Sequence, residues 1–225
     1  MSEKDNLIGL TDLPATTDEF KIKKYIDGLS NFILKCETPM TISIQGSWGS
    51  GKTSIMNMVQ KEIQDKVIPV FFNTWQFSQF SLGNALPLSM LQVFLNKISN
   101  GKKEELLKKL TKYGKKGLKI FVNAAARTVS GGILENPFET KDSPEKIDLA
   151  ESLEELHDSL QFAAQECCKE AGKDRIVVFI DDLDRLVPTK AMELLEVLKI
   201  FFDCKKCVFV LAIDYDVVIR GAAEK

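Results

Sequence analysis

The sequence predicts an α/β fold of three layers, in which a parallel sheet lies between helices. Four segments have the character of strands, at 41–45, 67–72, 175–181 and 207–213, and helical segments separate them. This alternation is typical of parallel sheets whose crossovers are right-handed. The third segment contains five consecutive apolar residues, Ile176 to Ile180, which indicates a central strand buried on both faces.

Helices are expected where apolar residues recur every three or four positions. The expected ranges are 22–33 after a capping box at Thr16–Glu19, then 55–63, 88–98, 149–167 after Ser143-Pro144, 194–202, and a short helix after Asp216. The second strand contains Pro69, which is tolerated near a sheet edge. Asn73 to Phe77 follow this strand, on the ligand side of the sheet.

Composition narrows the class of protein. The 225 residues are near the upper end for one domain, and a net charge of −2 argues against a dedicated nucleic-acid module. The sequence has neither an export signal nor an apolar stretch of membrane-spanning length, which predicts a cytoplasmic location. Five cysteines favour reduced thiols. The Cys204–Cys207 pair has C-x-x-C spacing, but its only further ligands for zinc would be Cys167, Cys168 and His157, so a chance pair is favoured.

A glycine-rich motif follows the first strand and precedes a helix. The run Gly46-Ser-Trp-Gly-Ser-Gly-Lys52-Thr53 fits G-x-x-x-x-G-K-[ST] at every fixed position. Its glycines let backbone N–H groups surround phosphates, Lys52 reaches the β- and γ-phosphates, and the Thr53 hydroxyl can bind Mg²⁺. The helix N-terminus adds its own attraction for phosphate. The expected nucleotide-binding residues are Gly46, Ser47, Trp48, Gly49, Ser50, Gly51, Lys52, Thr53 and Ser54.

Acidic residues stand at the carboxyl end of the third strand. Ligands of open α/β sheets bind at this edge. We expect Asp181 to be the acid associated with Mg²⁺, and Asp182 to be the base that takes a proton from the attacking water. Asp184 remains the alternative base.

Eight lysines crowd the segment from Lys102 to Lys119, within a helical or loop insertion expected at 102–140. Contact with nucleic acid or with a membrane surface is one interpretation. A solvated helix face followed by a loop is favoured, because bulky apolar residues at helical spacing are missing there.

With these residues identified, the chain resembles the KAP family of P-loop NTPases over essentially its whole length, 1–225. The resemblance rests on four motifs, which are 46–54, Phe72-Asn-Thr-Trp-Gln-Phe77, Ile180-Asp-Asp-Leu-Asp-Arg185 and Leu211-Ala-Ile-Asp-Tyr-Asp216. It implies the ASCE division, in which another strand separates the phosphate-loop strand from the acid strand. Many members carry transmembrane helices between these two motifs, and this chain departs from them there.

The resemblance also implies roles for residues around the site. Asp214 would be a polar sensor of the γ-phosphate, with a turn-capping Asp as the alternative. Arg185 would pair with Asp182 or Asp184, or act on a neighbouring subunit. Trp75 would pack beside the site. Family members are signalling scaffolds and parts of bacterial anti-phage or plasmid systems.

Together these points predict Mg²⁺-dependent ATP binding and slow hydrolysis by a regulatory or motor-like module of a larger protein. ATP is favoured over GTP because no Asn-Lys-x-Asp run follows the fourth strand. A nucleotide-gated scaffold with little hydrolysis is the alternative. We also expect the working protein to continue beyond Lys225 or to form an oligomer, because the last strand would leave a sheet edge open. Val217, Val218 and Ile219 would then have little to pack against.

Overall fold

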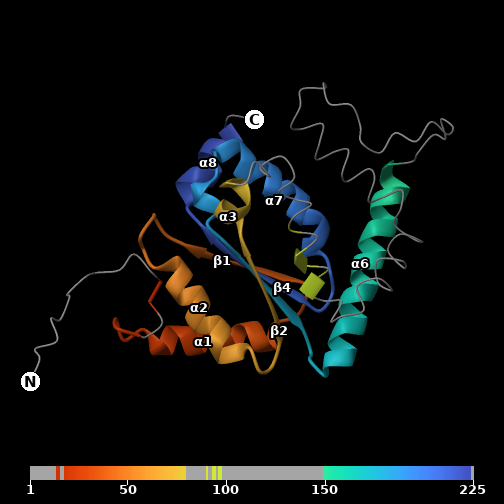
Figure 1. Cartoon of the computed structure of the whole chain (residues 1–225), viewed down its shortest axis with the longest axis horizontal. Helices are drawn as coiled ribbons and strands as arrows, with labels where there is room; N and C mark the ends of the chain where they lie inside the picture. The colour runs from red at the N-terminus through yellow and green to blue at the C-terminus, as the bar shows by residue number, and fades with distance from the viewer. Residues whose placement is uncertain are drawn as a thin grey trace, which may run out of the picture.

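The computed structural model of the chain describes residues 14–15, 18–79, 90, 93–94, 96–97 and 149–223. Within this part of the chain, parallel strands form one sheet in the order β1-β4-β3-β2. The strands are β1 (Met40–Gln45), β2 (Ile68–Asn73), β3 (Ile176–Asp181) and β4 (Cys207–Ile213). The sheet crosses the centre of the molecule (Figure 1). This order confirms the predicted parallel sheet, with β4 between the phosphate-loop strand and the acid strand.

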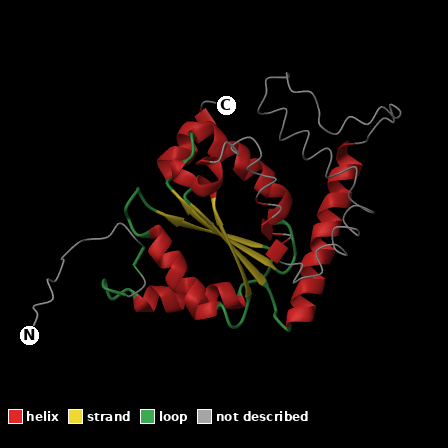
Figure 2. Cartoon of the chain, in the orientation of Figure 1, coloured by secondary structure: helices red, strands yellow, loops and turns green. Residues whose placement is uncertain are grey.

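Helices cover both faces of the sheet (Figure 2). They are α1 (Lys23–Lys35), α2 (Lys52–Ile63), α3 (Thr74–Gln79), α6 (Leu149–Ala171), α7 (Pro188–Phe202) and α8 (Tyr215–Ala223), with a 3₁₀ turn at Leu183–Arg185. Apolar side chains of α1 and α2 pack on one face, and those of α6 and α7 pack on the other. The three predicted layers are therefore present.

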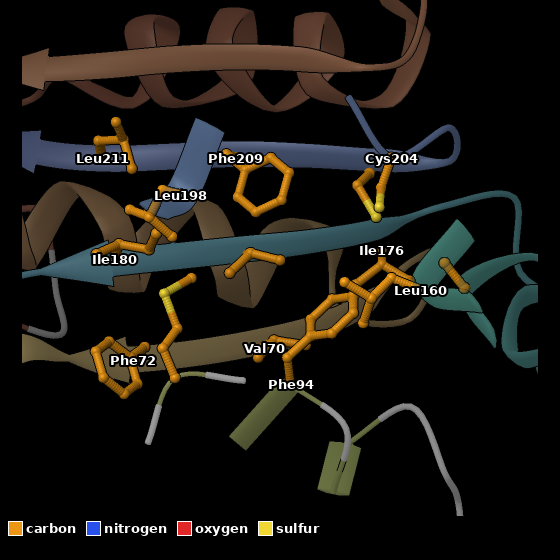
Figure 3. Packing of buried hydrophobic residues seen from close by; sticks show 14 of the residues in the cluster. Val70, Phe72, Phe94, Leu160, Ile176, Ile180, Leu198, Cys204, Phe209 and Leu211 are labelled. Atoms are coloured by element: carbon orange, nitrogen blue, oxygen red, sulfur yellow. The ribbon is translucent and has the colours of Figure 1, made fainter. Parts of the chain in front are cut away.

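The core on the α6–α7 face is built from alternate residues of the strands. Figure 3 shows Val70, Ile176 and Phe209 from three strands, facing Leu160 of α6 and Leu198 of α7. Burial of each such side chain contributes about 1.5–3 kcal/mol to folding. Every residue of β3 is buried, as the apolar run predicted. Pro69 lies on β2, at one end of the strand order, where a missing N–H is tolerated.

The expectation of an open edge at the last strand is wrong. The crossover through α7 returns the chain to the interior of the sheet, so β4 lies between β1 and β3. The helix after it is packed better than expected at one of the three apolar residues, whereas Ile219 is 48% exposed, as expected. Val217 of α8 is buried in the core, and Gly221 approaches the backbone of Pro188 at the start of α7.

The start of helix α1 differs from the expected position. Helix α1 begins at Lys23, where the Asp18 carboxylate accepts the backbone N–H groups of Ile22 at 2.9 Å and Lys23 at 2.7 Å. Asp18 therefore takes the capping role expected of Thr16, which lies outside the described residues. Helix α6 begins at Leu149, and its expected start at 143–144 also lies outside them.

Other expected features are described in part or not at all. From the helix expected at 88–98, Met90 and Phe94 are described and are buried in the core. The insertion at 102–140, with its lysine-rich segment, lies outside the described residues. In the described ranges, no helix has both the length and the apolar character needed to cross a bilayer.

Candidate functional site

A pocket of about 290 Å³ lies where the phosphate loop meets the residues that follow β3. It is lined by Pro14, Trp48, Gly49, Gly51, Lys52, Thr53, Ser54, Asp181, Asp182, Asp184 and Arg185. The lining joins six of the nine expected nucleotide-binding residues to the three acids expected near them. Among the described residues, three carboxylates and two cations line this pocket.

The loop itself has the backbone that its glycines allow. Gly49 and Gly51 have φ values of +79° and +86°, in the left-handed region that glycine tolerates best. The Gly46 N–H donates to the carbonyl of Ile213 at 3.2 Å, which attaches the start of the loop to the end of β4. Helix α2 then begins at Lys52, and Lys52, Thr53 and Ser54 of its first turn line the pocket.

Lys52 is buried and has three hydrogen-bond acceptors. Its Nζ donates to the carbonyls of Gly46 at 2.9 Å and Ser47 at 3.0 Å. It also forms an ion pair with Asp184, at 2.7 Å from Oδ2. Both side chains of this pair are almost fully buried, with exposed fractions of 8% and 6%. Water therefore screens this ion pair much less than a surface pair.

Asp181 offers a place for a divalent cation. Its Oδ1 accepts the Asp182 N–H at 2.8 Å, but its buried Oδ2 has no hydrogen-bond partner in the described part of the chain. Burial raises the pKa of the Asp181 carboxyl, and its contacts with the Thr53 side chain and the Asp182 backbone offset this only in part. A bound cation would satisfy Oδ2. Mg²⁺ is usually held by one or two carboxylates together with substrate phosphates, so Thr53 and Asp181 fit this ion.

Asp182 is held from two sides. Asn73 Nδ2 donates to its Oδ2 at 2.6 Å, and Arg185 Nε donates to its Oδ1 at 2.8 Å. Its own φ of +59° is a left-handed conformation that Asp adopts more readily than most residues. The guanidinium of Arg185 lies 5.2 Å from the ring centroid of Trp75, at cation–π distance. The pairing of Arg185 with Asp182 and the packing of Trp75 beside the site agree with the expectations.

Three residues at the site, Asn73, Pro14 and Ala15, have no role predicted from the sequence. Asn73 is a polar residue at the end of an apolar strand, and this pattern could have indicated a residue of the site. It is paired with Asp181 in the β2–β3 register. Pro14 lines the pocket, and the neighbouring Ala15 N–H donates to Ser54 Oγ at 3.0 Å. Nothing in the local sequence pattern indicated that these two residues lie beside the phosphate loop.

Asp214 has a different position from the other candidates. Its Oδ1 accepts the Asp216 N–H at 3.0 Å, which caps the start of α8. It does not line the pocket described above. This geometry agrees with the capping alternative.

The cysteines lie away from the pocket, and four of the five are buried. Burial raises the pKa of the Cys167 thiol to about 11. Within the described ranges, which contain all five cysteines, no group of three or more His, Cys, Asp or Glu side chains could hold a metal ion. The four buried cysteines pack in the hydrophobic core on the α6–α7 face as small apolar side chains.

The order of the strands, the glycine loop and the acids beyond β3 define the class of P-loop nucleotide-binding proteins. A comparison with protein families matches residues 22–225 to the KAP family P-loop domain. The chain therefore belongs to the KAP family of P-loop NTPases, and Pro14 and Ala15 precede the matched residues. A comparison with curated proteins found no match.

Proposed function

We propose that this domain binds ATP with Mg²⁺ and hydrolyses it slowly to ADP and phosphate, as a regulatory or motor-like module of a larger assembly. The observation that supports this most is the meeting of Lys52 with Asp181, Asp182 and Asp184 in one pocket. A phosphate-binding cation, a metal-binding acid and a base are the parts that phosphoryl transfer needs.

Each part has a role in binding or in proton transfer. The loop N–H groups and Lys52 hold the β- and γ-phosphates, and Thr53 and Asp181 hold the Mg²⁺. The bound ion supplies charge that offsets the negative charge of the phosphates. Asp182 orients the attacking water and takes its proton. Catalysis therefore depends on positioning and on charge, without a covalent intermediate.

Asp184 is the rival for the role of base. Its 2.7 Å contact with Lys52 brings it close to the expected position of the γ-phosphate. In the resting site, however, this contact makes it the counter-ion of the lysine. Asp182 also lines the pocket, and its partners among the described residues are Asn73 and Arg185, with no lysine among them. We therefore keep Asp182 as the base.

Two measurements test the proposal. The first is phosphate release with and without Mg²⁺, and the second is the binding of a non-hydrolysable ATP analogue. Lys52→Ala should weaken binding, whereas Lys205→Ala, at the exposed turn before β4, should not. Asp182→Asn should spare binding and abolish turnover, and Asp203→Asn is its exposed control. Loss of turnover in Asp184→Asn alone would make Asp184 the base. Equal turnover in wild type and Lys52→Ala would contradict the proposed function.

Two sets of contacts favour a second candidate function, in which the domain is a nucleotide-gated module that hardly hydrolyses ATP. Lys52 is already paired with Asp184, and both oxygens of Asp182 already accept hydrogen bonds. A γ-phosphate that competes for Lys52 could reorder the residues around the pocket, as in other nucleotide switches. Among the described residues that line the pocket, the arginine is Arg185. Its ion pair with Asp182 also fits a slow rate of ATP hydrolysis. Turnover too low to measure at every protein concentration, with tight ATP binding, would favour this candidate.

A further inference from the structure

The described lining of the pocket comes from three segments of the chain. Two of them are the phosphate loop with the start of α2, at 48–54, and the segment after β3, at 181–185. The third is the segment before α1, which contributes Pro14. The segment after β3 carries the three acids, and one of them, Asp184, is bound to Lys52. The groups proposed for Mg²⁺ and the γ-phosphate therefore belong to the first two segments.

A hydrogen bond attaches the third segment to helix α2. Ala15 N–H donates to Ser54 Oγ at 3.0 Å, although 39 positions separate the two residues in the chain. Ser54 lies in the first turn of α2 and is half-buried, whereas Pro14 and Ala15 are exposed. The contact therefore keeps Pro14, the residue next to Ala15, at the pocket.

A nucleotide presents two different surfaces to its site. Its phosphates need N–H groups and cations, which the phosphate loop and Lys52 offer. Its nucleoside needs mainly apolar side chains, as most small-molecule sites do. In the described part of the lining, the exposed apolar side chains are Pro14 and Trp48. Trp48 lies inside the phosphate loop, between Gly46 and Gly49, whereas Pro14 stands outside it and is available to the nucleoside.

We propose that Pro14 and Ala15 form a nucleoside wall, in which Pro14 packs against the nucleoside and Ala15 holds Pro14 in place through Ser54. This inference rests on the proposed nucleotide binding, with Lys52 at the phosphates. The family match begins at residue 22, so residues that precede the matched domain supply the wall. Pro14 is then a specificity-determining residue, which favours a nucleoside triphosphate over an inorganic polyphosphate.

Two ligands separate the wall from the phosphate site. The first is a non-hydrolysable ATP analogue, and the second is inorganic tripolyphosphate, which has no nucleoside; titration calorimetry measures both affinities. Pro14→Ala should bind the ATP analogue about fivefold more weakly, the effect of losing roughly 40 Å² of apolar contact. It should bind tripolyphosphate within twofold of wild type. Phe20→Ala is the matched control, because Phe20 is an apolar residue of the same segment that is 87% exposed and lies outside the described lining. It should leave both affinities within twofold of wild type.

A double-mutant cycle tests the role of Ala15. Ala15→Pro removes the donor of the hydrogen bond, because proline has no N–H. It should weaken binding of the ATP analogue about fivefold, the effect of one hydrogen bond of ordinary net strength. In the Ser54→Ala background the acceptor is missing, so Ala15→Pro should have no further effect on this affinity. An equal loss in both backgrounds would overturn the role of Ala15.

The wall and the proposed function fail in different ways. If Pro14→Ala weakens both ligands equally or changes neither, Pro14 does not contact the nucleoside. If Trp48→Ala loses affinity for the ATP analogue alone and Pro14→Ala does not, the nucleoside packs against Trp48 and the wall is wrong. In these cases nucleotide binding stands, provided that Lys52→Ala loses affinity for both ligands. If wild type binds neither ligand, the proposed function and the wall are both overturned.

Discussion

Lys52 Nζ lies 2.7 Å from Asp184 Oδ2, although 132 positions separate the two residues in the chain. The pair joins the phosphate loop to the segment after β3, and both side chains are almost fully buried. The lysine that we propose binds phosphate therefore has an acidic partner in the nucleotide-free structure.

Asp184 should weaken triphosphate binding, because its charge competes with the γ-phosphate for Lys52. We expect Asp184→Asn to bind an ATP analogue about tenfold more tightly, since one like charge near the phosphate costs on the order of 1–2 kcal/mol in a partly solvated site. The gain should be smaller for ADP. Titration calorimetry with both nucleotides measures this difference, and Asp158→Asn on the exposed face of α6 is the control. Weaker binding by Asp184→Asn would show that Asp184 instead holds Lys52 in its binding position.

Asp181 should reduce the stability of the nucleotide-free protein. Its pKa is raised on folding, so the native state binds more protons than the unfolded state between the ordinary value of 3.8 and the raised value. The free energy of unfolding therefore falls as the pH rises through this window. Above the raised pKa, Asp181→Asn should be more stable than wild type by about 1 kcal/mol, because a buried charge is removed. Urea unfolding at several pH values measures this gain, which should shrink as the pH falls toward 3.8.

The same substitution should remove the Mg²⁺-dependent part of ATP binding, since the carboxylate is the proposed metal-binding acid. Asp203→Asn is a control for both measurements. Full Mg²⁺-dependent binding by Asp181→Asn would contradict the assignment of Asp181.

ATP should displace a labelled ATP analogue more effectively than GTP. The residues after β4 are Asp214-Tyr-Asp216, with no Asn-Lys-x-Asp element to read guanine. We expect GTP to bind at least about tenfold more weakly, the effect of unmatched polar groups on the base. Competition titrations with the two unlabelled nucleotides measure this difference. Equal displacement would end the prediction of ATP specificity.

Two glycine-to-alanine substitutions should change stability in opposite directions. Gly28 lies in α1, and an added Cβ would have nothing within 4 Å, so Gly28→Ala should stabilise by about 1 kcal/mol through helix propensity. In α8, a Cβ at Gly221 would lie 2.3 Å from the carbonyl oxygen of Pro188. Gly221→Ala should therefore destabilise by about 1–3 kcal/mol. Thermal unfolding of the two variants compares them, and a tolerated Gly221→Ala would mean that α8 packs less closely on α7 in solution.

The sequence by itself determined the local structure and the chemical type of the site. Apolar periodicity is a local property, so it identified the strands and most helices. The phosphate loop could also be identified from the sequence, because it consists of consecutive residues. Asp181, Asp182 and Asp184 were also identified from the local sequence, since they stand at the end of an apolar run that is typical of a central strand.

Only the tertiary structure decided which of these residues meet. The Lys52–Asp184 ion pair and the Asn73–Asp182 hydrogen bond join residues 132 and 109 positions apart. Such contacts depend on strand order and register, which bring Asn73 beside Asp181 and insert β4 between β1 and β3. Local propensity contains no information about them, because parallel neighbours are joined by crossovers through whole helices. The partners of Asp182 and Asp184, and the packing of α8 on α7, therefore became visible only in the folded chain.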